Sequence, residues 1–139
     1  MKYKYWTGAH TKHRIRIHLV WIPKYRKRVL RGKVAIRIKE LIYQACMVNR
    51  WWIHQIAVNP NHIHINIQIN PSDSIAFVAQ KIKGGSSKII RDEFPELEEF
   101  LWGDSFWADG YFAESIGKVD ETIINAYIEK QSLSMPQKA

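Results

Sequence analysis

Residues 62–70 read His-Ile-His-Ile-Asn-Ile-Gln-Ile-Asn, an unbroken alternation of polar and apolar side chains. Successive side chains of a β-strand point to opposite faces, so the four isoleucines share one face. The histidines and amides then share the other face. The segment predicts a strand with one face in an apolar core and the other in a polar setting.

The chain on either side of this segment predicts its strand partners. Residues 51–58 read as a strand, and Asn59-Pro60-Asn61 as the turn that joins it to residues 62–70 in an antiparallel hairpin. Residues 13–22 also alternate, with Arg14, Arg16 and His18 on one face, and Pro23 ends this strand. A fourth strand is predicted at residues 107–114.

Three helices are predicted between and after these strands. Residues 32–49 carry an apolar stripe of helical period, and Ser74 or Asp73 can cap a helix that runs to about residue 94. Gly84-Gly85 within it predicts a kink or a close approach of another segment. The acidic segment of residues 93–99 is predicted to form a loop or a short helix. Residues 120–132 are predicted to form a final helix.

The order of the elements predicts the fold class. Strand, helix, strand, strand, helix, strand is a split βαβ plan repeated once. We expect an α+β, ferredoxin-like fold: a mostly antiparallel four-stranded sheet with helices on one face, plus an additional C-terminal helix. No linker divides the chain, so residues 1–139 should form one domain. The second face of the sheet should be free to carry chemistry or to meet a partner.

Composition narrows the class of protein. The 139 residues include 46% apolar side chains and one cysteine, Cys46, which excludes an intrachain disulfide and a multi-cysteine zinc site. No apolar run is long enough for a membrane span, and the start resembles no signal peptide. We therefore expect a cytoplasmic protein with no membrane partner.

Charge is unevenly distributed along the chain. Residues 1–50 hold 14 Lys and Arg against one acidic residue, whereas residues 51–139 hold 7 against 12. A basic half interleaved with aromatic residues favours a polyanion partner such as nucleic acid. A solvated basic surface is the alternative.

His62 and His64 form a candidate metal site. Two positions apart on one strand, their Cα atoms would lie about 6.6 Å apart and both imidazoles would project from one face. Two nitrogens could then converge on one metal ion. The alternative is a pair of exposed polar residues. His10, His13, His18 and His54 are interpreted as structural or phosphate-contacting.

The final predicted helix offers a second candidate. Tyr127 and Gln131 are four residues apart and so neighbours on one helical face. A phenolate at Tyr127 could attack phosphorus, and the amide oxygen of Gln131 could bind a hard cation such as Mg²⁺ or Mn²⁺. The alternative is that Tyr127 only packs within an apolar stripe.

Taken in order, these features resemble the single-tyrosine HUH transposases of small insertion sequences (TnpA type). The resemblance covers roughly residues 10 to 131 and rests on residues 18–30 (HLVWIPKYRKRVL), Asn61-His62-Ile63-His64, Tyr111-Phe112, and Tyr127 with Gln131. Asn61 departs from the family pattern, which commonly has aspartate there.

The resemblance implies an active site and a reaction. His62, His64 and Gln131 would be ligands of a divalent metal, Mg²⁺ or Mn²⁺, and Tyr127 the nucleophile. Such enzymes recognise DNA hairpins near the ends of their element, then cleave and rejoin single-stranded DNA through a 5′-phosphotyrosine intermediate. They act as homodimers. Gly117 in the connection of residues 115–119 could act as a hinge that lets the final helix pack on its own sheet or cross to the partner. The resemblance favours the crossing, which would complete the partner's active site in trans.

The basic residues would then bind DNA phosphates. We predict this role for Lys24, Arg26, Lys27, Arg28, Arg31, Lys33, Lys83 and Lys88. Two other functions stay open: a non-catalytic module of the same fold that binds single-stranded nucleic acid, and a metal-dependent hydrolase of small phosphoesters. Covalent attachment to DNA through tyrosine would distinguish the transposase from both.

Overall fold

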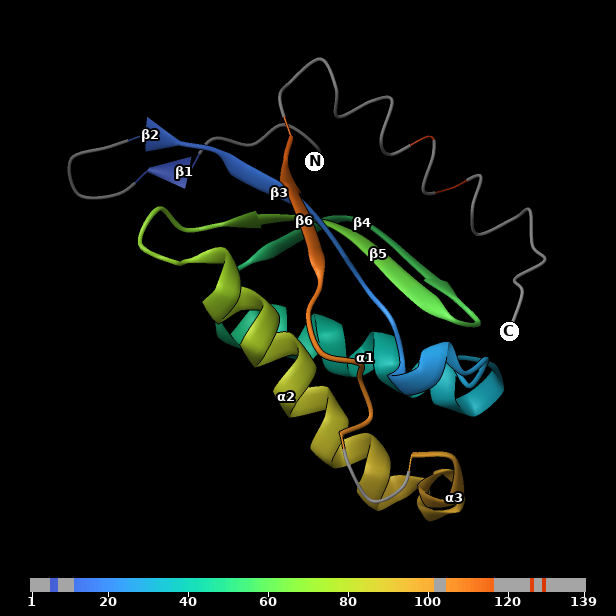
Figure 1. Cartoon of the computed structure of the whole chain (residues 1–139). Helices are drawn as coiled ribbons and strands as arrows, with labels where there is room; N and C mark the ends of the chain where they lie inside the picture. Colours follow the sequence, from blue (N-terminus) through green and yellow to red (C-terminus); the bar gives the residue numbers. More distant parts are fainter. Residues whose placement is uncertain (1–5, 8–11, 102–104, 117–125, 127–128, 130–139) are drawn as a thin grey trace.

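The structure is a computed structural model that describes residues 6–7, 12–101, 105–116, 126 and 129. A four-stranded sheet of order β4-β5-β3-β6 forms its centre (Figure 1). Its strands are β3 (Ile15–Trp21), β4 (Trp52–Asn59), β5 (His62–Ile69) and β6 (Phe112–Ser115), and each pairs antiparallel with its neighbour. The two long helices are α1 (Gly32–Val48) and α2 (Ile75–Glu93).

Strand β5 lies inside the sheet, between β3 and β4. The isoleucines at 63, 65, 67 and 69 are at most 2% exposed and belong to the hydrophobic core. They face Trp21, Leu19 and Ile17 of β3 across the ladder. The alternation in residues 62–70 therefore gave the strand and its buried face correctly.

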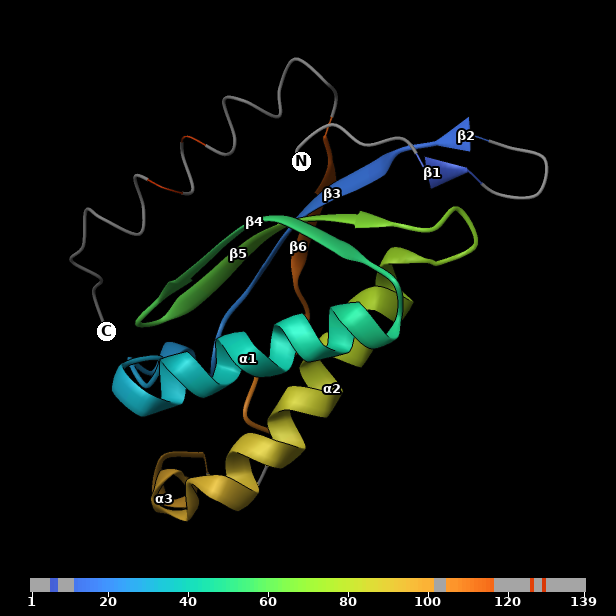
Figure 2. The ribbon, with the colours of Figure 1, turned by 180° about the vertical axis from the view of Figure 1, so that it is seen from behind.

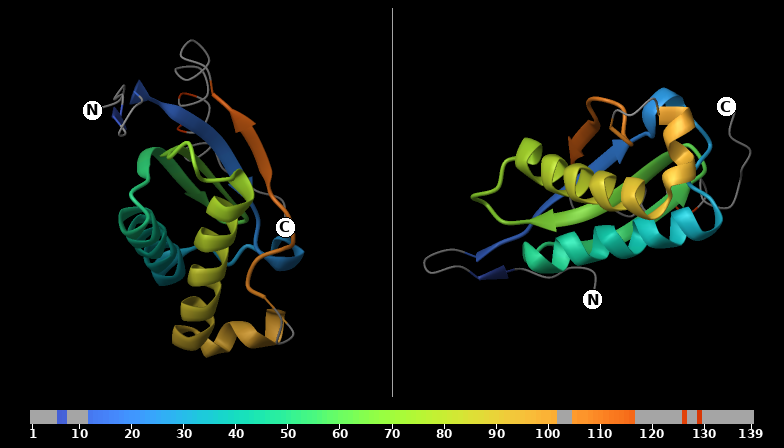
Figure 3. Two further views of the ribbon diagram at one scale, coloured as in Figure 1. Left: turned by 90° about the vertical axis from the view of Figure 1, so that its left-hand side faces the viewer. Right: turned by 90° about the horizontal axis from the view of Figure 1, so that it is seen from below.

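Helices α1 and α2 both cover the isoleucine face of the sheet (Figures 2 and 3). Helix α1 buries Ile38 and Ile42 against it, and α2 buries Val78 and Ile82. Ser74 caps α2, since its hydroxyl oxygen accepts a hydrogen bond from the Phe77 amide. The other predicted cap, residue 73, instead accepts a hydrogen bond from the Trp51 indole at 2.7 Å.

The shorter elements lie at the ends of this frame. Strands β1 (Trp6–Thr7) and β2 (Lys12–His13) pair with each other, and η1 (Lys24–Arg26) follows β3. The acidic segment forms η2 (Pro95–Leu97) and α3 (Glu98–Leu101), in agreement with the predicted short helix.

The fourth strand is shorter than predicted. Trp107 makes only an isolated bridge to Pro23, and the ladder with β3 begins at Phe112. Gly110 lies between them with φ of +81°, a left-handed conformation that interrupts an extended strand. Trp107 is a core residue instead: it is 2% exposed, and its indole donates to the Ser86 hydroxyl at 2.9 Å.

The predicted α+β sheet with helices on one face is confirmed. Of the predicted C-terminal helix, residues 120–132, the structure describes only Ala126 and Glu129, both helical. A single domain over residues 1–139 stays a prediction. No helix in the described part of the chain is long and apolar enough to cross a membrane.

The kink or close approach predicted at Gly84-Gly85 is wrong. Helix α2 runs through both glycines, and a Cβ built at either position meets no heavy atom within 4 Å. Both lie on the exposed side of α2. The pair therefore carries the entropic cost of glycine in a helix without a packing reason.

Replacing either glycine should stabilise the protein. Gly84→Ala and Gly85→Ala should each raise the free energy of unfolding by about 0.5–1 kcal/mol, because alanine restricts the unfolded chain and fits the helix. Urea denaturation measures this. Gly110→Ala is the matched control and should lower stability, because φ there is +81°. Destabilisation by both helix substitutions would show that the glycines have a structural role.

Candidate active site

The candidate site lies on the sheet face opposite α1 and α2. The sequence led us to expect that this face would be free. It is not, because every residue of β5 is buried, on both faces of the strand. The buried polar residues of this face, each at most 8% exposed, are Arg16, His18, Asn59, His62, His64, Asn66 and Gln68. The alternative that His62 and His64 are exposed polar residues is therefore excluded.

His62 and His64 lie side by side, as their spacing on β5 predicted. Their ring centroids are 4.7 Å apart, with ring planes nearly perpendicular. A partner engages one nitrogen of each ring. His62 Nδ1 lies 2.8 Å from the side-chain oxygen of the neighbouring Asn61, so Nδ1–H donates to that oxygen. The amide thus orients His62 although it replaces the aspartate of the family pattern.

The second ring, His64, is held by a third histidine. Its Nδ1 lies 3.2 Å from Nε2 of His18 on β3, and the two rings stack with centroids 5.4 Å apart. Both contacts involve Nδ1, so His62 and His64 would each bind a metal through Nε2. Outer partners of this kind fix the tautomer and orientation of metal-binding histidines.

Burial favours the neutral form of these rings, which is the form that binds metal. Burial, with smaller contributions from the neighbouring His62 and His18, lowers the pKa of His64 to about 4. Burial also lowers the pKa of His62, with a smaller contribution from the positive charge of Arg26. For His18, burial lowers the pKa and the carboxylate of Glu114 opposes the shift.

A buried amide beside His62 also fits an added group. Asn59 lies directly opposite His62 in the ladder and is 1% exposed. Neither its amide nitrogen nor its oxygen has a hydrogen-bond partner within the described part of the chain. A buried unsatisfied amide costs about 1–3 kcal/mol, which a bound ion's water or a phosphate could offset. Two oriented imidazoles and this amide are a donor set that a divalent metal and its water shell fit.

The third predicted ligand and the nucleophile are not described. Tyr127 and Gln131 both fall outside the described residues. Between them, Glu129 is described, and its carboxylate accepts a hydrogen bond from Gln55 on β4 at 3.1 Å. Gln55 pairs with Asn66, two positions beyond His64 on the same face. Within the described residues, no three His, Cys, Asp or Glu side chains are arranged to hold a metal ion.

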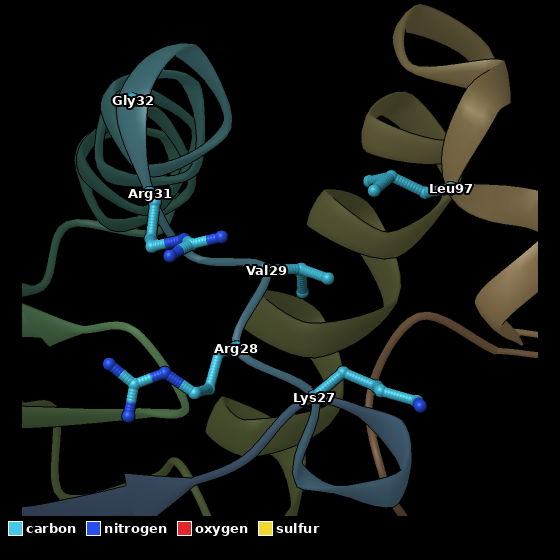
Figure 4. A pocket seen from close by; sticks show the side chains of 6 residues that line it. All are labelled: Lys27, Arg28, Val29, Arg31, Gly32 and Leu97. Carbon is cyan, nitrogen blue, oxygen red and sulfur yellow. The ribbon is translucent and has the colours of Figure 1, made fainter. Parts of the chain in front are cut away.

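Several predicted DNA-binding residues surround a hollow between η1 and α1 (Figure 4). The hollow has a volume of about 480 Å³ and is lined by Lys27, Arg28, Val29, Arg31, Gly32 and Leu97. It includes the N-terminus of α1, which has no acidic residue in its first turn and no side-chain cap. A helix N-terminus is positively polarised, so the whole hollow favours anions.

The other predicted DNA-binding residues differ in their surroundings. Lys24 and Arg26 lie in η1, and exposed Lys33 begins α1 beside the hollow. Lys88 is exposed on α2, away from them in the chain. Lys83 instead donates to the carbonyl oxygens of Ala108 and Gly110 at 2.8 and 2.7 Å. Its ammonium group therefore holds the segment that leads into β6.

Two polar contacts were missed from the sequence. The alternation of residues 13–22 placed His18 on the polar face, but its contact with His64 depends on the register between β3 and β5. That register pairs Val20 with His64, which makes His18 and His64 diagonal neighbours. The bond between Asn61 and His62 depends on the turn geometry. Neither contact can be predicted from the spacing of residues within one segment of the sequence.

Sequence comparison with known proteins shows which family the chain matches. Residues 11–131 match the family described as "Transposase IS200 like". The ISDra2 transposase TnpA of Deinococcus radiodurans is 29% identical over 119 residues, 86% of this chain and 85% of that protein. The transposase for insertion sequence element IS200 of Salmonella typhimurium is 28% identical over 123 residues, 88% and 80% of the two chains.

Solved structures agree with the fold. A putative transposase from Deinococcus radiodurans superposes with a TM-score of 0.75 at 26% identity, over 90% of this chain and 96% of that one. A REP-associated tyrosine transposase bound to a REP hairpin gives 0.60 at 14% identity, over 91% and 70%, and this likeness concerns the fold alone. The fold and the sequence matches together define a DNA transposase. The chain belongs to the IS200-like transposase family, which confirms the resemblance seen in the sequence.

The polar face should make stability depend on pH. Burial lowers the pKa of His54 from 6.5 to about 4, although its hydrogen bond to Gln68 opposes the shift. Between these values the unfolded chain binds a proton that the folded chain does not. The stability that neutral His54 contributes is therefore fully present above its pKa in the unfolded chain and is lost as the pH falls towards 4.

The variant His54→Gln should lose less stability than the wild type when the pH falls from about 7 to about 4.5. Urea denaturation at a series of pH values measures this difference. Wild type and variant should have parallel profiles above about pH 7, where His54 is neutral in both states. Parallel profiles over the whole range would contradict the lowered pKa of His54.

Proposed function

We propose that this transposase cleaves and rejoins single-stranded DNA by transferring the scissile phosphate to Tyr127, with His62, His64 and Gln131 as ligands of a divalent metal. The observation that carries the proposal is the pair of buried imidazoles, each with Nδ1 in a contact that would leave Nε2 as the ligand atom. Family membership supports the roles of Tyr127 and Gln131.

The bonds that form and break in this reaction belong to the chain and the DNA. The Tyr127 hydroxyl loses its proton and its oxygen attacks the phosphorus, while the bond to the 3′ oxygen breaks. That oxygen takes up one proton, which balances the one lost by Tyr127, and leaves as a hydroxyl. When bound, Mg²⁺ or Mn²⁺ would stabilise the charge that develops on the phosphate oxygens. The phosphotyrosine retains the energy of the phosphodiester, so a 3′-hydroxyl can reverse the step and rejoin DNA without ATP.

We propose that the hollow beside α1 binds phosphates of a DNA hairpin. Lys27, Arg28 and Arg31 supply positive charge there, and Lys24, Arg26 and Lys33 extend it along η1 and α1. A structural neighbour with the same fold is described as bound to a REP hairpin, which supports this class of ligand. The carbonyl bonds of Lys83 give it a structural role, so we leave it out of this surface.

A covalent adduct tests the proposed chemistry. Incubation with a single-stranded element end should give the wild type a protein–DNA adduct on a denaturing gel, and Tyr127→Phe should abolish it while DNA binding survives. EDTA and His64→Ala should also abolish the adduct, whereas Gln131→Ala should be milder because water can replace an amide oxygen. Cleavage without an adduct would indicate a hydrolase, and binding alone a non-catalytic module.

The same assay tests the proposed homodimer with active sites completed in trans. Tyr127→Phe and His64→Ala subunits should each be inactive but should form the adduct when co-expressed as mixed dimers. In a trans arrangement, one site combines intact histidines of one subunit with Tyr127 of the other. Mixed dimers verified by two different tags that form no adduct would show that the tyrosine acts within its own chain.

Salt dependence tests the hollow. The double variant Arg28→Ala/Arg31→Ala should reduce the slope of log affinity against log salt for a hairpin by about 2, since each lost phosphate contact releases about one counterion fewer. Lys39→Ala/Lys81→Ala, on exposed positions of α1 and α2, is the matched control of equal charge. Equal slopes for the two double variants would place the phosphate contacts elsewhere.

A further inference from the structure

His18 is a third buried histidine at the candidate metal site. It lies on β3, is 7% exposed, and its ring stacks on His64 with an interplanar angle of 14°. Its Nε2 is 3.2 Å from Nδ1 of His64. His18 therefore uses the nitrogen at the tip of its ring to contact His64, which excludes this atom as a ligand of the same metal.

The contact between the two rings has a direction that metal binding fixes. A neutral imidazole carries one proton, and the nitrogen that binds a metal must present its lone pair. If His64 binds through Nε2, its proton is on Nδ1 and is donated to Nε2 of His18. If His18 donated instead, His64 would carry its proton on Nε2, and that atom could not be a ligand.

The strand next to His18 favours the first direction. Glu114 on β6 lies directly opposite His18 in the ladder, so the two side chains share a face. A nearby carboxylate attracts the N–H of an imidazole, and Nε2 of His18 is already directed at His64. Glu114 therefore favours a proton on Nδ1 of His18, which leaves its Nε2 as an acceptor.

We infer that His18 is a positioning residue of the active site, whose Nε2 accepts the Nδ1–H of His64 and so presents Nε2 of His64 to the metal. The inference rests on the proposed metal-binding role of His64. It makes the two ligands different: an amide oxygen orients His62, whereas a second imidazole orients His64. Glu114 acts through His18 and touches neither ligand in this assignment.

Three substitutions separate hydrogen bonding from packing. His18→Phe keeps a ring that can stack on His64 but removes the acceptor. His18→Gln keeps an acceptor oxygen at about the distance of Nε2 and removes the ring. Glu114→Gln removes only the charge that favours a proton on Nδ1 of His18. Circular dichroism and thermal unfolding confirm that each variant is folded.

The readouts are the binding of Mn²⁺, followed by electron paramagnetic resonance, and the ¹⁵N shifts of the His64 ring in the metal-free protein. Wild-type His64 should carry its proton on Nδ1. His18→Phe should weaken Mn²⁺ binding by about 10–100-fold, the usual effect of losing an outer partner, and should shift the His64 tautomer. His18→Gln should bind Mn²⁺ within about threefold of wild type, and Glu114→Gln should lie between them.

The outcomes distinguish this inference from the proposed function. If wild type binds Mn²⁺ and His18→Phe binds it equally well, the positioning role is wrong while the metal site stands. A wild-type His64 protonated on Nε2 would also overturn the role, whatever happens to the variants. If wild type binds no Mn²⁺ and forms its DNA adduct in EDTA, the proposed metal site itself is wrong and the inference falls with it.

Discussion

The burial of β5 on both faces is the constraint on which the rest of the structure depends. Its isoleucines must be covered by α1 and α2, and this sets which side of the sheet the helices take. Its histidines and amides are then forced to the opposite side, where each buried polar atom needs a partner. Asn61 and His18 meet this need for His62 and His64, so the contacts that satisfy these buried rings also orient the candidate active site.

The basic hollow lies on the connection that follows β3, the strand that pairs with β5. After β3, residues 22–31 lead past η1 to the first turn of α1, and Tyr25 and Arg26 there have φ of 59° and 52°. A left-handed backbone at a residue other than glycine raises the conformational energy by about 1 kcal/mol or more. Such a conformation is kept where the surrounding structure fixes it. The strained turn brings the charge of Arg26 near enough to His62 to lower its pKa. The connection after β3 therefore carries both the basic residues that line the hollow and a charge that acts on His62.

Much of the fold could be predicted from periodicity, because β5, α1 and α2 each have a face whose burial decides their pattern. The structure of residues 107–111 could not be predicted in this way. Trp107 packs as a single core residue, and the left-handed Gly110 separates it from the strand that follows. The prediction at Gly84-Gly85 was wrong because glycine in a helix often allows another segment to pack closely, and here no neighbouring segment does so. The pairing of His62 and His64 followed from their spacing, whereas the contact of His18 required the register of two strands separated by a helix and a hairpin.

The two carbonyl bonds of Lys83 link α2 to the segment that leads into the edge strand β6. Lys83 belongs to α2, which packs on the apolar face, and its ammonium group holds the segment before β6. Strand β6 in turn carries Glu114 opposite His18 on the polar face. Ser86 of α2 also accepts the indole N–H of Trp107, so α2 holds the segment before β6 at more than one point. The position of the edge strand that carries Glu114 is therefore set in part by the helix that packs on the apolar face.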